Sequence, residues 1–424
     1  MTFEEGKVIE VTAYEVDRFG KGVSKVDDFV IFTDGLLEGE TAKVEISKVK
    51  KNFAEAKIKK LINQSPLRKT FTSKLGALDL YHLKDEEQIK WQETITKNIL
   101  SRSLGVNIEL SNPIFGSSLN YRNKVVYHVL EDEILKLGMY QKDPIELIEV
   151  HTFILNHPLI QRVVSKIQQQ RILVDYEALK HIVFRTNGQK VLVTLVSYKE
   201  QFKGLNELVQ LIKTFDEVIG ITLNIKPSDK VILGPHSKVL FGENQLTYQF
   251  NHLTLKINDR SFMQVHTEVM LSVYEKISKH ITQNDVVIDA YSGVGSIGYS
   301  IGESAKKVIM IENNPENTKM ARELKKHHKG SYEIIEGNVE KELRKVRGDI
   351  IILDPPRSGL DPKALPIIFE KKFKRIIYLS CELNTLQRDL KVLCNNYDIN
   401  AIHAVRMFPQ TTSIETLVIL DKKH

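Results

Sequence analysis

The sequence predicts an α/β protein whose C-terminal part, residues 253–424, forms a doubly wound, Rossmann-like parallel sheet. Apolar runs of strand length alternate there with helix-like sequence, which is typical of parallel strands buried on both faces. Several of these runs end on an acidic residue or a cysteine, at the edge where such sheets bind ligands. Residues 1–60 are predicted to form a small β-barrel, and residues 61–252 a mixed α/β domain.

The composition is that of an ordinary globular chain. Of 424 residues, 42% are hydrophobic and 27% are charged, which suggests two or three domains. The first residues lack an apolar signal core and no run of about 18 apolar residues occurs, so we expect a cytoplasmic protein without a membrane partner. Two cysteines form no disulfide framework. A net charge of +6 permits a polyanionic partner.

The predicted barrel consists of short strands with glycines between them. We expect strands at residues 8–14, 29–32, 41–47 and 53–58, a spacing typical of small barrels. Residues 43–60 contain seven lysines and two glutamates. This charge pattern fits a solvated face and a nucleic-acid contact equally well.

The middle of the chain predicts a helix and then a mixed α/β region. Residues 84–104 have helix composition, and residues 84–118 are expected to pack against the C-terminal domain. Further along, β-like runs alternate with helical ones. Strands are expected at 124–130, 181–184, 191–196 and 239–240, and helices at 159–170 and 205–214.

A glycine-rich turn follows the first strand of the C-terminal domain. The run 286–288 ends in Asp289, and Gly293, Gly295 and Gly298 form a G-x-G-x-x-G pattern that opens a helix. Glu312 ends the next strand, where an acid accepts hydrogen bonds from ribose hydroxyls. This pattern fits a dinucleotide site as well as other adenosine ligands.

Further strands of this domain end on polar residues. Residues 332–335 lead to Asn338, and residues 350–353 lead to Asp354. The run 375–380 ends on Cys381, which helix-like sequence follows at once. One thiol, Asp354 and the downstream Glu415 are therefore expected along one edge of the sheet. A thiol presented at such an edge is a candidate nucleophile.

These residues lie in motifs that resemble a known family. DPPRSGL at 354–360, YLSCELNTLQRD at 378–389 and FPQTTSIETLVIL at 408–420 resemble, in order and spacing, the signature of the S-adenosylmethionine-dependent RNA uracil-C5-methyltransferases. The resemblance extends over nearly the whole chain and favours the 23S ribosomal RNA branch. DRFGKGVSK and LEGETAKVEI resemble that family's RNA-binding TRAM barrel, and residues 121–124 resemble its YRNK motif.

The resemblance implies roles for individual residues. Cys381 would add to C6 of uracil in 23S ribosomal RNA, and Glu415 would remove the C5 proton, giving 5-methyluridine. Arg122 and Lys124 would approach the RNA, with no metal involved. The residues implied for binding S-adenosylmethionine are Gln264, Tyr291, Gly293, Gly295, Ser296, Glu312, Asn338 and Asp354. We expect the protein to act as a monomer.

The chain departs from the family pattern at several places. Ser296 stands where asparagine is frequent, and Glu382-Leu383 where Asn-Pro is frequent. Many members bind a [4Fe-4S] cluster through cysteines, but here that region reads Leu75-Gly76-Ala77-Leu78, and the later cysteine position falls near Thr152-Phe153. Because cluster ligands must be thiolates, we expect no iron-sulfur cluster, and apolar side chains in its place.

Three other functions remain alternatives. An NAD-dependent oxidoreductase would explain the glycine turn and Glu312 but gives no task to Cys381 or Glu415. A non-catalytic RNA-binding protein would explain the basic barrel but not the thiol and carboxylate at strand ends. Within the family, a tRNA T-loop uracil-C5-methyltransferase is the alternative to the 23S enzyme, although that branch typically lacks a TRAM barrel.

Overall fold

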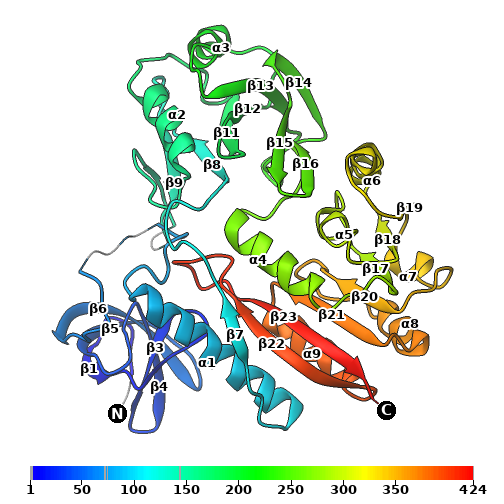
Figure 1. Ribbon diagram of the computed structural model, residues 1–424. Coiled ribbons are helices and arrows are strands. Elements are labelled where there is room, and N and C mark those ends of the chain that lie inside the picture. The colour runs from blue at the N-terminus through cyan, green and yellow to red at the C-terminus, as the bar shows by residue number, and fades with distance from the viewer. Residues whose placement is uncertain (1–2, 71–72, 74, 143–144, 424) are drawn as a thin grey trace. The chain divides into compact units, whose positions relative to one another are not determined.

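The computed structural model describes residues 3–70, 73, 75–142 and 145–423. It divides into two compact units, and Figure 1 labels their helices and strands. Unit 1 comprises Met1–Pro113 and Phe408–Ile414, and unit 2 comprises Ile114–Met407 and Glu415–His424. The predicted domain limits at residues 60 and 252, and the predicted packing of residues 84–118, stay predictions. Residues 1–2 and 424, at the ends of the predicted outer domains, lie outside the described residues.

Unit 1 contains a six-stranded sheet that encloses an apolar core. Its strands are β1 (Val8–Thr12), β2 (Glu15–Val16), β3 (Lys21–Val26), β4 (Phe29–Asp34), β5 (Thr41–Val49) and β6 (Phe53–Asn63). They run in the order β1-β5-β6-β4-β3-β2, and only β4 and β6 pair in parallel. Ala42, Val44 and Ile46 alternate along β5 and are buried in the core, as the period of a half-buried strand requires.

The sequence analysis missed strand β3. Gly22 lies inside this strand and hides its pattern. A Cβ at Gly22 would lie 2.5 Å from the carbonyl oxygen of Leu36, so glycine lets the Leu36 backbone approach the strand closely.

Helix α1 (Asp85–Leu104) matches the predicted helix and anchors the segment Phe408–Ile414 within unit 1. Buried Gln410 donates its backbone N–H to Gln88 Oε1 at 2.9 Å, and its side-chain oxygen accepts from Gln88 Nε2 at 2.7 Å. Its carbonyl oxygen accepts from the N–H of Leu80 at 3.0 Å. The residues that directly precede Glu415 in sequence are therefore held firmly in this unit.

The first part of unit 2 is a seven-stranded mixed sheet in the order β10-β9-β8-β11-β12-β13-β14, on which two helices pack. Strand β7 (Ser111–Ile114), of which only Ile114 belongs to unit 2, precedes this sheet in sequence, and a separate hairpin follows it. The elements are β8 (Lys124–Val129), β9 (Leu137–Tyr140), β10 (Leu147–Glu149), α2 (Pro158–Gln168), β11 (Leu179–Thr186), β12 (Val191–Ser197), α3 (Leu205–Ile212), β13 (Val218–Ile225), β14 (His236–Gly242), and the hairpin strands β15 (Gln245–Phe250) and β16 (Leu253–Asn258).

The second part of unit 2 is the predicted doubly wound sheet. Its strands are β17 (Val286–Ala290), β18 (Lys307–Glu312), β19 (Tyr332–Glu336), β20 (Ile350–Leu353), β21 (Arg375–Ser380), β22 (Tyr397–Val405) and β23 (Glu415–Lys422). They run in the order β19-β18-β17-β20-β21-β23-β22. The strands from β19 to β21 are parallel, and β23 is antiparallel to both of its neighbours.

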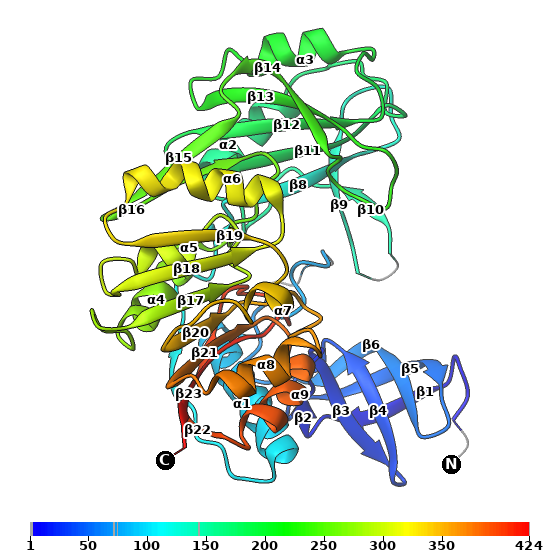
Figure 2. The same ribbon diagram turned by 90° about the vertical axis from the view of Figure 1, so that its right-hand side faces the viewer.

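Helices cover both faces of this sheet, as a doubly wound fold requires. They are α4 (Thr267–Ser278), α5 (Ser296–Ser300), α6 (Pro315–Leu324), the 3-10 helix η1 (Lys325–His327), α7 (Val339–Glu342), α8 (Ala364–Lys371) and α9 (Leu383–Leu393). Helices α4 and α5 lie on one face, and α7, α8 and α9 lie on the other (Figure 2). The predicted fold class is therefore confirmed. Within the described residues, no helix is both long enough and apolar enough to cross a membrane.

Candidate active site

The predicted nucleophile and base lie at one edge of the doubly wound sheet. Cys381 directly follows parallel strand β21, and Glu415 begins β23, which runs in the opposite direction. Ser380 pairs with Thr416 across these neighbouring strands, so Cys381 and Glu415 are the next residues outward on each. Paired strands lie about 4.8 Å apart. The edge therefore places a thiol beside a carboxylate.

The glycine turn after β17 is tied to the acidic residues of the same edge. Asp289 Oδ2 accepts from the N–H of Gly298 at 2.9 Å. Glu312 accepts from the N–H of Gly293 at 2.9 Å and from the N–H of Asn314 at 2.8 Å. A Cβ added at Gly293 would meet no atom within 4 Å. The turn is thus fixed by its backbone while open space lies beside it.

Three carboxyl groups of the edge hold their protons unusually strongly. Burial raises the pKa of Asp289 to about 8, of Asp354 to about 7 and of Glu415 to about 8. The charge of Asp354 adds to the effect at the other two groups. Buried like charges resist ionising together. A cation placed among these groups would favour their ionised forms, so the edge suits a positively charged ligand.

The thiol of Cys381 is half-buried, and its environment acts on its ionisation in both directions. Burial raises the pKa of Cys381, the neighbouring Glu415 and Asp354 raise it further, and Arg357 lowers it. Sequence analysis gave Arg357 no role, although it stands in the motif that contains Asp354. The thiolate is the reactive form of cysteine, so Arg357 favours the reactive form of Cys381.

The departure at Glu382 is structurally accommodated. Glu382 is the N-cap of α9, and its Oε1 accepts from the N–H of Asn384 at 3.2 Å. The N–H of Glu382 in turn donates to Ser380 Oγ at 3.3 Å. The turn that bears Cys381 is therefore held on both sides by side-chain oxygens.

Helix α9 clamps the loop that follows Asp354. Buried Asp389 accepts from the N–H of Leu360 at 3.0 Å and from the hydroxyl of Tyr378 at 2.7 Å. Arg388 Nη2 donates to the carbonyl oxygen of Leu360 at 3.0 Å. Sequence reasoning quoted these residues only as parts of motifs. The contacts explain why DPPRSGL and YLSCELNTLQRD occur together, because the second motif fixes the loop of the first.

The other predicted cofactor residues lie on the same part of unit 2. Ser296 Oγ accepts from the Tyr274 hydroxyl at 2.9 Å. Tyr291 has a left-handed backbone with φ of 63°. Asn338 is exposed at the start of α7. The N–H of the preceding Gly337 donates to the carbonyl oxygen of Glu312 at 2.9 Å, which joins the ends of β18 and β19.

The two predicted RNA-contacting residues lie at and just before the start of strand β8, in the other sheet. Lys124 begins β8, where burial and the nearby Arg185 lower its pKa to about 8. The guanidinium of Arg122 lies over the Phe153 ring, 5.5 Å from its centre. Both side chains are half-buried. In unit 1, Leu78 and Leu80 are buried in the region where the sequence predicts apolar side chains in place of cluster ligands. Among the described residues, no group of three or more His, Cys, Asp or Glu side chains is arranged to hold a metal ion.

Three known families match parts of the chain. Residues 320–423 match the family described as tRNA (uracil-5-)-methyltransferase, residues 2–59 match the TRAM domain, and residues 264–366 match the methyltransferase small domain. The first match covers Cys381 and Glu415, and the second covers the six strands of the unit 1 sheet up to Lys59.

Relatives and a solved structure match over almost the entire chain. The uncharacterized RNA methyltransferase YljE of Lactococcus lactis is 30% identical over 99% of this chain and 98% of its own length. An uncharacterized RNA methyltransferase of Bacillus cereus is 31% identical over 99% and 97%. The tRNA (uracil-54, C5)-methyltransferase of Pyrococcus abyssi, solved with S-adenosyl-L-homocysteine, covers 97% of this chain and 100% of its own, with a TM-score of 0.75. At 21% identity, this last likeness establishes the fold.

Proposed function

Because this chain belongs to the RNA uracil-C5-methyltransferase family, we propose that it is a cytoplasmic enzyme that transfers a methyl group from S-adenosylmethionine to C5 of a uridine in 23S ribosomal RNA. The observation that carries the proposal is the meeting of Cys381 and Glu415 at adjacent strand ends. Neither an oxidoreductase nor a passive RNA-binding protein needs a buried base beside a thiol.

The residues at the sheet edge fit the proposed cofactor. S-adenosylmethionine supplies a methyl group on a positively charged sulfonium. Glu312 is placed at the strand end from which an acid binds ribose hydroxyls, and open space lies beside Gly293. Burial raises the pKa of Asp289 and of Asp354 in the free protein, so a nearby cation would favour the ionised form of both carboxyl groups. Gln264, Tyr291, Gly295, Ser296 and Asn338 complete the proposed binding set.

The proposed chemistry uses the thiol first and the carboxylate last. C5 of uracil is a weak carbon nucleophile, so the Cys381 thiolate adds to C6 and makes C5 an enolate carbon that accepts the methyl group. Glu415 then takes the C5 proton, the C5–C6 double bond reforms and the thiolate leaves. A carboxylate is a stronger base when its pKa is raised toward the working pH, and burial raises the pKa of Glu415 to about 8.

The choice of 23S ribosomal RNA rests on the family branch that the motifs resemble. The N-terminal TRAM match supports a large RNA substrate, with Arg122 and Lys124 contacting it. The Pyrococcus abyssi protein, named for tRNA, keeps the tRNA T-loop as the alternative. With two cysteines in the chain, an iron-sulfur cluster has too few thiolate ligands, and we propose that the enzyme works without one.

Nucleoside mapping decides between the substrates. Ribosomal and transfer RNA from a strain lacking this gene are digested and analysed by mass spectrometry for 5-methyluridine. Loss at a 23S position, restored by the wild-type gene but not by Cys381→Ala, supports the proposal. Loss only from tRNA establishes the alternative, and no loss from either RNA contradicts the proposed function.

A further inference from the structure

The segment Ser261-Phe262-Met263-Gln264-Val265 is held at one end by a residue of the seven-stranded sheet and at the other by Asn123, which directly precedes strand β8 of that sheet. It leads from the β15–β16 hairpin into α4 and contains Gln264, a proposed cofactor contact. Phe262 is 72% exposed, whereas Met263, in the middle of the segment, is buried and fixes one point of its backbone. The hydrogen bonds at the two ends then set the direction of the backbone that bears Gln264.

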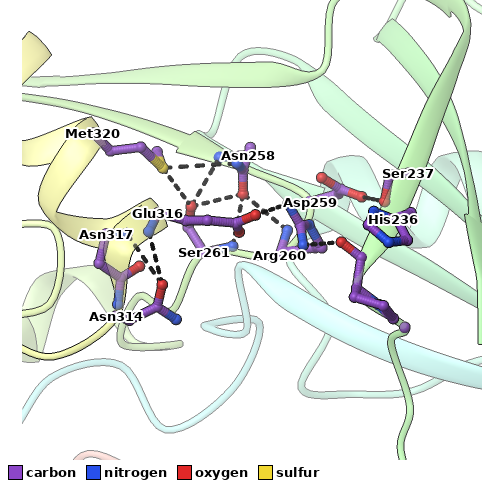
Figure 3. A network of polar contacts seen from close by, with 12 residues as sticks. His236, Ser237, Asn258, Asp259, Arg260, Ser261, Asn314, Glu316, Asn317 and Met320 are labelled. Carbon is purple, nitrogen blue, oxygen red and sulfur yellow. Dashed lines mark hydrogen bonds and ion pairs between the residues drawn. The ribbon is translucent and has the colours of Figure 1, made fainter.

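Arg185 holds the first end. This arginine of β11 is 2% exposed, and its Nη2 donates to the carbonyl oxygen of Ser261 at 2.6 Å. Ser261 donates its N–H and its hydroxyl to Asn258 Oδ1 at 2.8 and 2.7 Å, and its hydroxyl lies 3.2 Å from the sulfur of Met320 in α6. Figure 3 shows Asn258, Ser261 and Met320 converging at this point.

A second contact fixes the same turn to α6. Arg260 donates to the carbonyl oxygen of Pro235 and to Glu316 Oε1, the latter at 2.5 Å (Figure 3). The turn before Gln264 thus has partners in β11 and in the helix that follows β18. Such a turn has little freedom to shift.

Asn123 holds the second end. It is 3% exposed, and its Nδ2 donates to the carbonyl oxygen of Gln264 and to Thr267 Oγ1, each at 3.0 Å. Its backbone N–H donates to the carbonyl oxygen of Val265 at 3.0 Å. Two donors from one residue therefore grip consecutive carbonyl groups, one of which belongs to Gln264.

The side chains from Tyr121 to Lys124 point alternately to opposite sides of the backbone. Tyr121 is buried and stacks on His266 with ring centres 4.5 Å apart. Burial alternates from Tyr121 to Lys124, with positions 121 and 123 buried and 122 and 124 half-buried. Successive side chains of extended backbone point to opposite sides. The short stretch thus turns two side chains toward the Gln264 segment and two away from it.

We propose that Asn123 is a positioning residue for Gln264, with Arg185 fixing the other end of the same segment. The proposal rests on the proposed function, in which Gln264 belongs to the set of residues that binds the cofactor. A side chain displaced by about 1 Å from its working position loses much of its catalytic effect. Losing the Asn123 amide donors frees the Gln264 carbonyl, so the Gln264 side chain no longer has one defined position.

Asn123→Asp tests this, because it keeps the size of the side chain and removes both amide donors. We expect kcat for RNA methylation to fall about 10- to 100-fold, while KM for RNA stays within about twofold. In a Gln264→Ala background, the same substitution should cause no further loss, since a positioning residue acts only through the residue it places. Arg185→Lys, which keeps the charge but shortens the reach to Ser261, should show the same pattern and replaces Asn123→Asp if that variant does not fold.

Asn187→Asp is the matched control. Asn187 Nδ2 also donates to a backbone carbonyl oxygen, that of Thr247, at 2.7 Å, but outside the segment. The kcat of Asn187→Asp should stay within about twofold of the wild-type value. Losses from Asn123→Asp and Gln264→Ala that multiply in the double variant would overturn the inference, as would unchanged kcat in Asn123→Asp. If the wild-type protein methylates no uridine in RNA, the proposed function fails instead.

Discussion

Burial at the sheet edge opposes the ionisation of individual carboxyl groups. Asp289 is fully buried and has a pKa of about 8 in the folded protein, against 3.8 for an ordinary aspartate. Below pH 4 both folded and unfolded chains hold this proton. As the pH rises from 4 to 8, the unfolded chain releases it and the folded chain does not, so the stability of the folded state falls.

Asp289→Asn should remove this pH-dependent loss. An asparagine oxygen still accepts the hydrogen bond from Gly298, and no charge needs to be buried. The free energy of unfolding should exceed that of wild type by about 1 kcal/mol or more at pH 8, and the two should be nearly equal at pH 4. Urea denaturation across this range measures the difference. Exposed Asp398 serves as control, since Asp398→Asn should change little at either pH; a difference for Asp289→Asn that does not vary with pH would refute this account.

The position of some residues could be predicted from sequence, and the position of others could not. Asp354 and Cys381 follow apolar runs, and the carboxyl ends of parallel strands share an edge, so their placement there followed from pattern. Glu415 begins the antiparallel strand β23, and only the motif linked it to that edge. Asn123 binds the backbone carbonyl oxygen of Gln264, and Arg357 lowers the pKa of Cys381. Both partners lie far away in sequence. Nothing in a local pattern tells which distant carbonyl a buried asparagine meets.

At the scale of elements, the clamp between α9 and the loop 354–360 makes a prediction about Gly359. This glycine has φ of 75°, and a Cβ there would lie 2.7 Å from Thr385 Cβ and from Arg388 Nη2. Gly359→Ala should therefore both strain the backbone and push the loop away from α9. Gly35→Ala is the matched control, because Gly35 has φ of 70° with no atom within 4 Å of the added Cβ.

Gly35→Ala should lower the free energy of unfolding by about 1 kcal/mol, because alanine is strained in the left-handed region. Gly359→Ala should lose more than this and should also slow formation of the covalent RNA adduct, because Asp354 and Arg357 lie on the displaced loop. Urea denaturation and adduct gels measure the two effects. Equal losses of stability in both variants, with normal adduct formation, would mean that the clamp does not hold the loop.

Some strands of the doubly wound sheet could be predicted from sequence. Strands β17, β18 and β20 are largely apolar and buried on both faces. An apolar run of strand length predicts such a strand from sequence alone. Strand β13, Val218–Ile225, went unpredicted. Gly220 interrupts its pattern, and a Cβ there would lie 1.7 Å from the carbonyl oxygen of Glu243. Only glycine fits at position 220, because the backbone of Glu243 lies so close. That approach is visible only in the folded structure.

At the scale of the whole molecule, the basic charge of unit 1 should contribute to RNA affinity. The lysines of residues 43–60 are exposed, and lysines that neutralise phosphates release counterions and make binding depend on salt. Lys50→Glu with Lys51→Glu should weaken RNA binding and reduce the slope of log K against log salt by about 1 to 2. Affinity for S-adenosylhomocysteine should not change.

Lys325→Glu with Lys326→Glu is the matched control, an exposed adjacent pair in unit 2 with the same change of charge. Filter binding at several salt concentrations compares the two double variants. If both pairs lower affinity and slope equally, net charge alone acts and the barrel makes no specific contact with RNA.

Trapping the adduct on RNA that contains 5-fluorouridine shows whether Cys381 forms the bond to uracil and Glu415 ends the reaction. Fluorine at C5 cannot leave as a cation, so wild type should accumulate a covalent protein–RNA species on a denaturing gel, and peptide mass should place it on Cys381. Cys381→Ala should give none. Glu415→Gln should accumulate a methylated adduct even with ordinary uridine, with turnover about 100- to 10,000-fold lower. An adduct mapped to Cys394, or near-normal methylation by Cys381→Ala, would contradict the account.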